Sequence, residues 1–148
     1  MHKAVISATG VYTPELSISN AELVEAFNAW ASAENARNAP RIESGEMEAI
    51  GLSSEEFIVK ASGIERRYVL NKSGVLDPKV MHPVLPERGD DEISVMAEMA
   101  VSAANEALGK AGKSAADIDG VICAASNHER AYPAIAIEVQ QALGTAGF

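Results

Sequence analysis

Residues 117–148, DIDGVICAASNHERAYPAIAIEVQQALGTAGF, contain the stretch that decides the predicted fold. Residues 121–125 are an unbroken apolar run between a glycine and a polar segment, which is typical of a strand buried on both faces. Pro133 lies where a first helical residue is expected, and apolar residues at helical spacing follow it until Gly144. In open α/β sheets, ligands bind at the loop that leaves the carboxyl end of a strand. The polar loop at residues 126–133 is therefore the first candidate for a site.

The composition is that of an ordinary soluble globular domain. The 148 residues are 47% hydrophobic and 22% charged, which is enough for one domain with a core. A formal net charge of −9 argues against a nucleic-acid surface, because phosphate binding needs clustered Lys and Arg. The single cysteine permits no internal disulfide, and neither a signal peptide nor a membrane helix is recognisable. We therefore expect a cytoplasmic protein that binds neither nucleic acid nor membranes.

Two further strands and two irregular segments are predicted. Residues 3–9 (KAVISAT) have the apolar character of a second buried strand, and residues 65–70 (ERRYVL) alternate enough for a short one. Residues 32–52 lose helical periodicity, apart from a short helix expected at 44–50. Residues 71–90 hold several proline, glycine and aspartate turn signals, which predict a long loop. Loops of that length in compact domains are usually functional or disordered.

Three more helices are predicted from their caps and apolar faces. Ser19 and Glu22 form a capping box that begins the first, whose apolar stripe is expected to pack in the core. A second capping box at residues 53–56 begins a short helix that a glycine ends. The longest helix has one face of small apolar residues, and Asp90 or Asp91 is expected to cap it.

The residues that could carry chemistry have simpler explanations. Cys123 lies inside the predicted buried strand, away from any cation that would lower its thiol pKa, so we expect a buried small hydrophobe. His2, His82 and His128 are isolated, and no pair has the spacing of metal ligands. We therefore expect neither a metal nor a bound cofactor. The absence of a glycine-rich turn after the first strand argues against a Rossmann-like nucleotide-binding domain.

A basic cluster is a second, weaker candidate site. Arg66 and Arg67 are adjacent, and Lys60 lies nearby on the predicted helix, so that together they could bind a phosphate-bearing ligand. A solvated charged surface is the more frequent explanation for such a doublet. The polar loop at residues 126–133 is the stronger candidate, because its place after a strand also indicates contact with a ligand.

Three blocks of sequence resemble the β-ketoacyl-acyl carrier protein synthase III family. Residues 6–14 (ISATGVYTP) with residues 19–23 (SNAEL) are similar to the opening of these enzymes. Residues 57–67 (FIVKASGIERR) are similar to their W-I-x-x-R-[ST]-G-I-x-x-R segment. Residues 118–122 (IDGVI) and a later Tyr-Pro pair are similar to the strand and the F-P turn that follow. The blocks occur in order over nearly the whole chain, and this combination is specific.

The resemblance implies an α/β protein of the thiolase-type fold, in which two similar α/β/α halves pack together and dimerise. The family condenses an acyl-coenzyme A primer with malonyl-acyl carrier protein in fatty acid biosynthesis. Its catalytic cysteine would follow just after Phe148, and its catalytic histidine and asparagine belong to the second half. We therefore expect an N-terminal fragment that lacks the third core strand and the second half, carries insertions at about 32–52 and 71–90, and is inactive alone.

The resemblance also places two binding regions on this chain. The coenzyme A mouth falls on Ser53, Phe57, Lys60, Ala61, Ser62 and Arg67. Phe57 replaces the tryptophan that stacks on adenine and Ala61 replaces an arginine that holds the coenzyme, which argues against the usual acetyl primer. The acyl pocket would be edged by Ser126, Asn127 and Tyr132, and Tyr132 would reach the partner's acyl channel across the dimer interface.

Two other functions stay open. A related condensing enzyme would use a longer or aromatic primer for a secondary metabolite. A non-catalytic acyl-binding or interaction module would have lost the second half of the fold. A reading frame that continues past Phe148 into a short strand and a cysteine would favour the enzyme.

Overall fold

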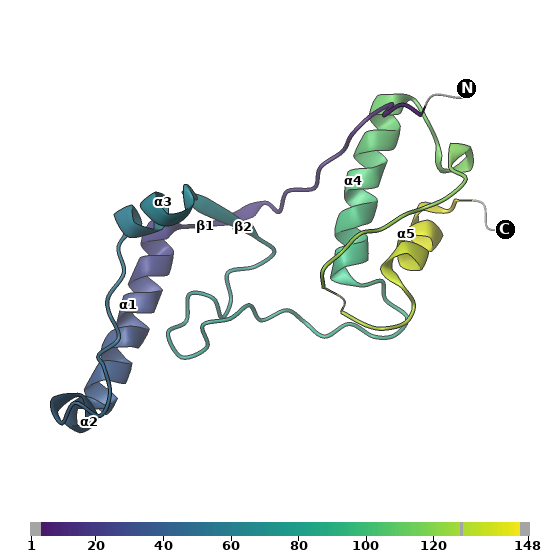
Figure 1. The fold of residues 1–148 in the computed structure, drawn as a ribbon. Helices are drawn as coiled ribbons and strands as arrows, with labels where there is room; N and C mark the ends of the chain where they lie inside the picture. The colour runs from purple at the N-terminus through teal and green to yellow at the C-terminus, as the bar shows by residue number, and fades with distance from the viewer. Residues whose placement is uncertain (1–3, 128, 146–148) are drawn as a thin grey trace. The chain divides into compact units, whose positions relative to one another are not determined.

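A computed structural model (Figure 1) describes residues 4–127 and 129–145 of the chain. It divides into two compact units, one made of Thr13–Pro86 and the other of Met1–Tyr12 with Glu87–Phe148. The described residues form five α-helices, one 3-10 turn and one two-stranded sheet, so this part of the protein is α/β. No helix in this described part is long and apolar enough to cross a membrane.

The sheet belongs to the first unit. β1 (Leu16–Ser19) pairs antiparallel with β2 (Arg66–Val69), and Ile18 stands opposite Arg67. Ile18 is only 1% exposed and anchors this small sheet. The strand predicted at 65–70 is confirmed, whereas its partner was not predicted, because four residues are too few to show a clear alternation.

α1 (Asn20–Arg37) begins at the predicted capping box. The Ser19 hydroxyl accepts from the Glu22 N–H at 3.2 Å, and the Glu22 carboxylate accepts from the Ser19 N–H at 2.8 Å. The helix continues past residue 32, where periodicity was expected to end, because residues 32–37 (SAENAR) are mostly good helix formers. α2 (Ala39–Glu43) follows at once, so the short helix predicted at 44–50 is wrong.

α3 (Glu55–Ser62) is the predicted short helix, with its cap one residue later than expected. Ser54, rather than Ser53, accepts from the Phe57 N–H at 3.2 Å. Gly63 ends the helix with a φ of 69°, a left-handed conformation that glycine adopts without steric cost.

The second unit is built on α4 (Val95–Ala111) and α5 (Ile135–Leu143), which lie side by side (Figure 1). Its core consists of Ala97, Ile135 and Val139, which are at most 6% exposed. The small residues that face α5 from α4 permit this close packing. In the sequence, the 3-10 turn Ala115–Asp117 follows α4 and precedes α5.

The predicted first residues of α4 and α5 both need correction. Ser94 caps α4, not Asp90 or Asp91, and its hydroxyl accepts from the Ala97 N–H at 3.2 Å. α5 begins two residues after Pro133, with Ala134 at its N-cap. Its predicted end at a glycine is confirmed.

Two predicted strands are not strands in the described residues. Residues 4–9 and 121–125 pair with no other strand there, and residue 3 lies outside that part. Ile6 and Ile122 are 87% and 99% exposed. A buried strand needs neighbours that supply its hydrogen bonds, and the described residues supply none beside either segment. The predicted two-sided parallel sheet is therefore wrong for this structure, and Cys123 is exposed instead of buried.

The N-terminal segment nevertheless packs against α4. Gly10 lies so close to this helix that an added Cβ would be 2.0 Å from the Ala103 carbonyl oxygen. The Val11 N–H donates to the Glu106 carboxylate at 2.7 Å. Gly10 was expected only to mark a turn, and its main role in the structure is this close approach of two backbones.

Candidate functional site

An apolar cavity of about 490 Å³ lies within the unit Thr13–Pro86. Four segments form its walls: α1, the chain just before α3, α3 itself and the loop after β2. This volume lies in the range of ligand sites for small molecules, which are usually apolar with a few polar groups. The cavity is therefore a candidate binding site for a small molecule.

α1 contributes Leu23, Val24 and Phe27 to the cavity. The Phe27 ring also packs against Trp30, with 5.6 Å between the ring centroids. This stripe was predicted to be core, but Phe27 and Trp30 are only half-buried. The helical spacing was predicted correctly, and the residues of this stripe form part of a cavity wall as well as packing contacts.

Two asparagines on α1 hold the wall that precedes α3. The Asn28 side chain donates to the Ser53 carbonyl at 3.0 Å and accepts from the Ser53 N–H at 2.8 Å. Asn35, two helical turns later, makes the same pair of bonds with Ile50 at 2.9 and 2.8 Å. Each amide thus pairs with the chain as a neighbouring strand would. Residues 51–53, which line the cavity, are fixed between these two clamps.

The loop after β2 is fastened to α1 by an ion pair. Lys72 Nζ lies 2.6 Å from Glu22 Oε1. The other Glu22 oxygen accepts from the Ser19 N–H and hydroxyl at 2.8 and 2.9 Å. The hydrogen bond from Lys72, followed by those from Ser19, lowers the pKa of Glu22 from 4.5 to about 2. One carboxylate therefore caps α1 and holds the loop.

A hydrogen bond joins the two ends of the same loop, whose middle part lines the cavity. The Asn71 side chain donates to the Val84 carbonyl at 2.8 Å, which joins the two ends of the loop. Gly74 has a φ of 77°, and an added Cβ would lie 2.3 Å from the carbonyl oxygen of a residue on the opposite side of the loop. This closure brings Val75 and Met81 to the cavity wall. The segment predicted as a long loop is therefore an ordered part of the site.

The residues predicted for the coenzyme A mouth lie on and around α3. Ser53 and Phe57 both line the cavity, and Phe57 is 65% exposed. Lys60, Ala61 and Ser62 are exposed along the same helix. The Ser62 hydroxyl is engaged locally, since it donates to the carbonyl of the residue four positions earlier at 2.8 Å. These five residues therefore lie on α3 or just before it, and two of them line the cavity.

Arg67, the sixth predicted residue, is oriented by a buried asparagine. Asn20 is 3% exposed, and its carbonyl oxygen accepts from Arg67 Nη1 at 2.9 Å. Its amide donates to the Ile64 carbonyl at 2.8 Å. Asn20 thereby connects the start of α1 to the turn after α3 and fixes the direction of the guanidinium. The sequence alone gave no signal for this long-range role.

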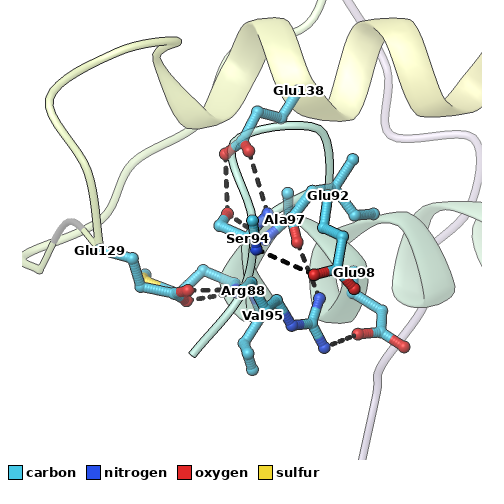
Figure 2. A network of polar contacts seen from close by, with 11 residues as sticks. Arg88, Glu92, Ser94, Val95, Ala97, Glu98, Glu129 and Glu138 are labelled. Atoms are coloured by element: carbon cyan, nitrogen blue, oxygen red, sulfur yellow. Dashed lines mark hydrogen bonds and ion pairs between the residues drawn. The ribbon is translucent and has the colours of Figure 1, made fainter. Parts of the chain in front are cut away.

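The loop at residues 126–133 belongs to the other unit and serves partly as a cap for α4. Figure 2 shows two carboxylates directed at the start of this helix. Glu129 accepts from the Val95 and Met96 N–H groups at 3.0 and 2.8 Å. Glu138 accepts from the Ser94 N–H and hydroxyl at 2.9 and 2.7 Å, and it is 2% exposed.

The three residues predicted to edge an acyl pocket are exposed in this second unit. Ser126 and Asn127 are exposed, and Tyr132 is 89% exposed. Arg130, from the same loop, lies 4.0 Å from the buried Glu138 carboxylate. The loop is thus divided between residues that fix the helix and residues that remain accessible.

The chemistry available at the cavity is binding rather than catalysis. Its lining contains no titratable side chain, and Ser53 supplies the polar one. His82 is exposed in the loop after β2, while His2 and His128 lie outside the described residues. In the described part of the chain, no group of three His, Cys, Asp or Glu could hold a metal ion. The described residues that line the cavity can therefore enclose an apolar group.

Three known proteins similar to this chain are all named as synthases that act on an acyl carrier protein. A "beta-ketodecanoyl-[acyl-carrier-protein] synthase" of Pseudomonas aeruginosa is 58% identical over 125 residues, which are 84% of this chain and 36% of that protein. A "beta-ketoacyl-[acyl-carrier-protein] synthase III" of Rhizobium johnstonii is 37% identical over 67% of this chain and 24% of its own length. A protein of the same name from Bartonella tribocorum is 30% identical over 97% of this chain and 31% of its own length.

These similarities concern only part of each relative. The chain spans between 24% and 36% of the length of these three proteins. No protein-family profile matches it.

Proposed function

Because these relatives confirm that the chain resembles the β-ketoacyl-[acyl-carrier-protein] synthase III family, we propose that it is the N-terminal part of a condensing acyltransferase. The identity of 58% over 125 residues is the observation that carries this proposal. In the proposed reaction, an acyl group from acyl-coenzyme A is joined to malonyl-acyl carrier protein, and free coenzyme A and carbon dioxide are released. The catalytic cysteine, histidine and asparagine would lie outside these 148 residues, so the chain alone would be inactive.

The proposed primer is a medium-length acyl group. The relative with 58% identity is named for a β-ketodecanoyl product. Since decarboxylative condensation adds two carbons, a ten-carbon product would come from an eight-carbon primer. Phe57 and Ala61 replace the family's tryptophan and arginine at the coenzyme itself, so these replacements would change the affinity for the coenzyme rather than the choice of acyl length.

The proposed binding surface for coenzyme A is the exposed side of α3 together with β2. Lys60 and Arg67 would supply cationic groups to its phosphates. The exposed ring of Phe57 would stack on the base, and Ser53, Ala61 and Ser62 would complete the surface. Arg67 is already oriented by its bond to Asn20, which supports a fixed geometry for the phosphate contact.

The proposed fold of the complete protein is the layered thiolase type, and the complete protein would be a homodimer. The exposed segments at residues 4–9 and 121–125 support this proposal, because they have strand-forming sequences without strand partners in the described residues. Ser126, Asn127 and Tyr132 would edge the acyl pocket. The exposed Tyr132 side chain would be available to a partner subunit.

A condensation assay on the complete polypeptide that includes this chain tests the proposed function. The protein is incubated with octanoyl-coenzyme A and malonyl-acyl carrier protein, and the carrier protein is analysed by mass spectrometry. We expect β-ketodecanoyl-carrier protein, and no product from the 148-residue chain used as a control. Absence of product with every saturated primer from acetyl to dodecanoyl would reject the function, while a product from acetyl-coenzyme A alone would reject the proposed primer.

A further inference from the structure

We propose that Glu138 is a positioning residue for the acyl pocket: through Arg130 it fixes the loop at residues 126–133 and thereby the place of Tyr132, which selects the acyl length. This inference rests on the proposed function, because that function puts the edge of the acyl pocket on this loop. The resemblance to the synthase family names residues at the edge of the pocket, and it assigns no role to the buried carboxylate behind them.

Glu138 is a buried charge that the proposed reaction does not use. It lies in the first turn of α5 and is only 2% exposed. A carboxylate at such a position needs partners, because burial removes the water that would otherwise stabilise it. Figure 2 shows Glu138 directed from α5 at Ser94, which donates its N–H and hydroxyl at 2.9 and 2.7 Å. Arg130 Nε lies 4.0 Å from the same carboxylate. One side chain therefore joins both helices to the loop.

The charge at this position specifies a direction that an apolar residue would not. An apolar side chain of similar volume would fill the same space, often without loss of stability. A carboxylate differs because it holds a cationic side chain on one particular side. The Arg130 side chain is 20% exposed, so solvent and salt screen the attraction only in part. The pair therefore opposes movement of the loop away from α5.

Glu129, next to Arg130, fixes the loop to α4 by a second route. Its carboxylate accepts from the Val95 and Met96 N–H groups at 3.0 and 2.8 Å. N–H groups in the first turn of an α-helix have no partner inside the helix, and the helix dipole favours a negative charge there. The loop thus has two adjacent anchors, and Glu138 holds one of them.

Tyr132 lies between these anchors and the buried part of α5. Ile135, at the start of this helix, is 6% exposed and belongs to the core of the unit. Only residues 131–134 separate it from Arg130, and so short a segment permits little movement once both ends are held. Tyr132 itself is 89% exposed, so its own packing contributes little to its position. Its place at the pocket edge therefore depends on the anchors beside it.

Amide exchange in the 148-residue chain tests whether Glu138 fixes the loop. The Val95 and Met96 N–H groups are bonded to the loop, so their exchange rates, measured by NMR, report whether it is docked. Glu138→Gln keeps the side-chain length and removes the charge, and we expect both amides to exchange faster. Glu106→Gln is the matched control, because this carboxylate binds the Val11 N–H in the same unit, about three turns further along α4. It should leave both rates unchanged, and equal rates in the two variants would overturn the inference.

The acyl-length preference of the complete polypeptide tests the consequence for the pocket. kcat/KM is measured for each saturated primer from hexanoyl- to dodecanoyl-coenzyme A. We expect Glu138→Gln to lower the ratio of kcat/KM for octanoyl to that for dodecanoyl by about tenfold, since a misplacement of about 1 Å can cost about 100-fold. A purely structural role would lower the values for all primers alike. Free coenzyme A should inhibit the variant as before, because the surface proposed for it belongs to the other unit.

Arg130→Gln provides an independent test if Glu138→Gln does not fold. It removes the opposite charge of the pair, and circular dichroism checks that the helices are retained in each variant. If Glu138 acts through Arg130, the double variant should have the same ratio of octanoyl to dodecanoyl activity as either single variant. Two effects that multiply, or a ratio that neither variant changes, would overturn the inference.

The inference and the proposed function can fail separately. If the complete protein makes β-ketodecanoyl-carrier protein and both variants keep its preference for the octanoyl primer, the positioning role is wrong and the function stands. If the complete protein condenses nothing, the proposed function is wrong, and the exchange rates of Val95 and Met96 alone then decide whether Glu138 fixes the loop.

Discussion

At the scale of single residues, Glu22 joins two parts of the unit that contains the cavity. Its carboxylate caps α1 through Ser19 and receives Lys72 from the loop that carries Met81. The ion pair requires the ionised carboxylate, and the hydrogen bonds from Ser19 are stronger to that form. The sequence predicted the cap, because Ser19 and Glu22 are three residues apart, but not the ion pair, because Lys72 lies 50 residues later. The sequence therefore predicts the local hydrogen bonds of Glu22 but not its ion pair with a distant residue.

This arrangement predicts a specific loss of stability in acid. The pKa of Glu22 is lowered from 4.5 to about 2 in the folded protein, so its contribution is complete above 4.5 and disappears as the pH falls toward 2. Glu22→Gln should lower the melting temperature at neutral pH and flatten its decline across this acid range. Circular dichroism melts at a series of pH values measure the effect. Glu25→Gln, an exposed change on the same helix, should leave the pH profile as it is, and an unchanged profile for Glu22→Gln would disprove the assignment.

A pair of glycine substitutions should have opposite effects on stability. Gly10→Ala places a Cβ 2.0 Å from the Ala103 carbonyl oxygen, so the segment or α4 must move. We expect a loss of about 1–3 kcal/mol in the free energy of unfolding. Gly109→Ala, within α4, meets no atom within 4 Å and should stabilise the helix by up to about 1 kcal/mol. Urea denaturation compares the two variants, and equal stabilities would show that Gly10 does not pack against α4.

At the scale of secondary structure, most helices were predicted correctly, whereas β2 was the one predicted strand that the structure confirms in the described residues. The end of α3 at Gly63 and the start of α1 at Ser19 follow from residues that lie within one turn. The cap of α4 was misjudged because Ser94 is supported by Glu138, which is 44 residues away. A strand depends on a partner that the local sequence does not specify, which is why residues 121–125 were misassigned.

The candidate site shows the same division between local and long-range information. The apolar stripe of α1 was predicted from its spacing, as core, and the region around Phe57 was predicted from the resemblance and stays a prediction. The clamps at Asn28 and Asn35 were missed, because an asparagine seven residues after another is compatible with any exposed helix face. Their partners are backbone groups 15 to 25 residues later, and only the folded structure identifies them.

Removing one clamp should loosen the wall of the cavity. Asn28→Ala leaves the N–H and carbonyl of Ser53 without their partners, at a cost of about 1–3 kcal/mol if water does not replace them. Hydrogen exchange measured by mass spectrometry should show faster exchange across residues 50–54 than in the unmodified chain. Asn105→Ala, at an exposed position on α4, is the matched control and should leave that segment protected. Equal exchange in both variants would contradict the clamp.

At the scale of the whole molecule, two apolar segments, residues 4–9 and 121–125, contain strongly exposed side chains. Residues 121–125 include Ile122, which is 99% exposed, and Cys123, which is also exposed. The chain spans about a third of the length of the P. aeruginosa relative. If the proposed layered fold is right, strands in the rest of the complete polypeptide would pair with this segment and cover it.

Cys123 reports directly on this proposal, because it is the single cysteine of the chain. Its thiol should react readily with a maleimide in the 148-residue protein, where it is exposed. In the complete polypeptide, burial within a sheet should slow the same reaction strongly, since labelling then requires local opening. Peptide mapping by mass spectrometry separates Cys123 from any other cysteine, and urea-unfolded complete protein gives the unprotected rate. A Cys123 that reacts as fast in the folded complete protein as in the short chain would show that residues 121–125 do not enter a buried sheet.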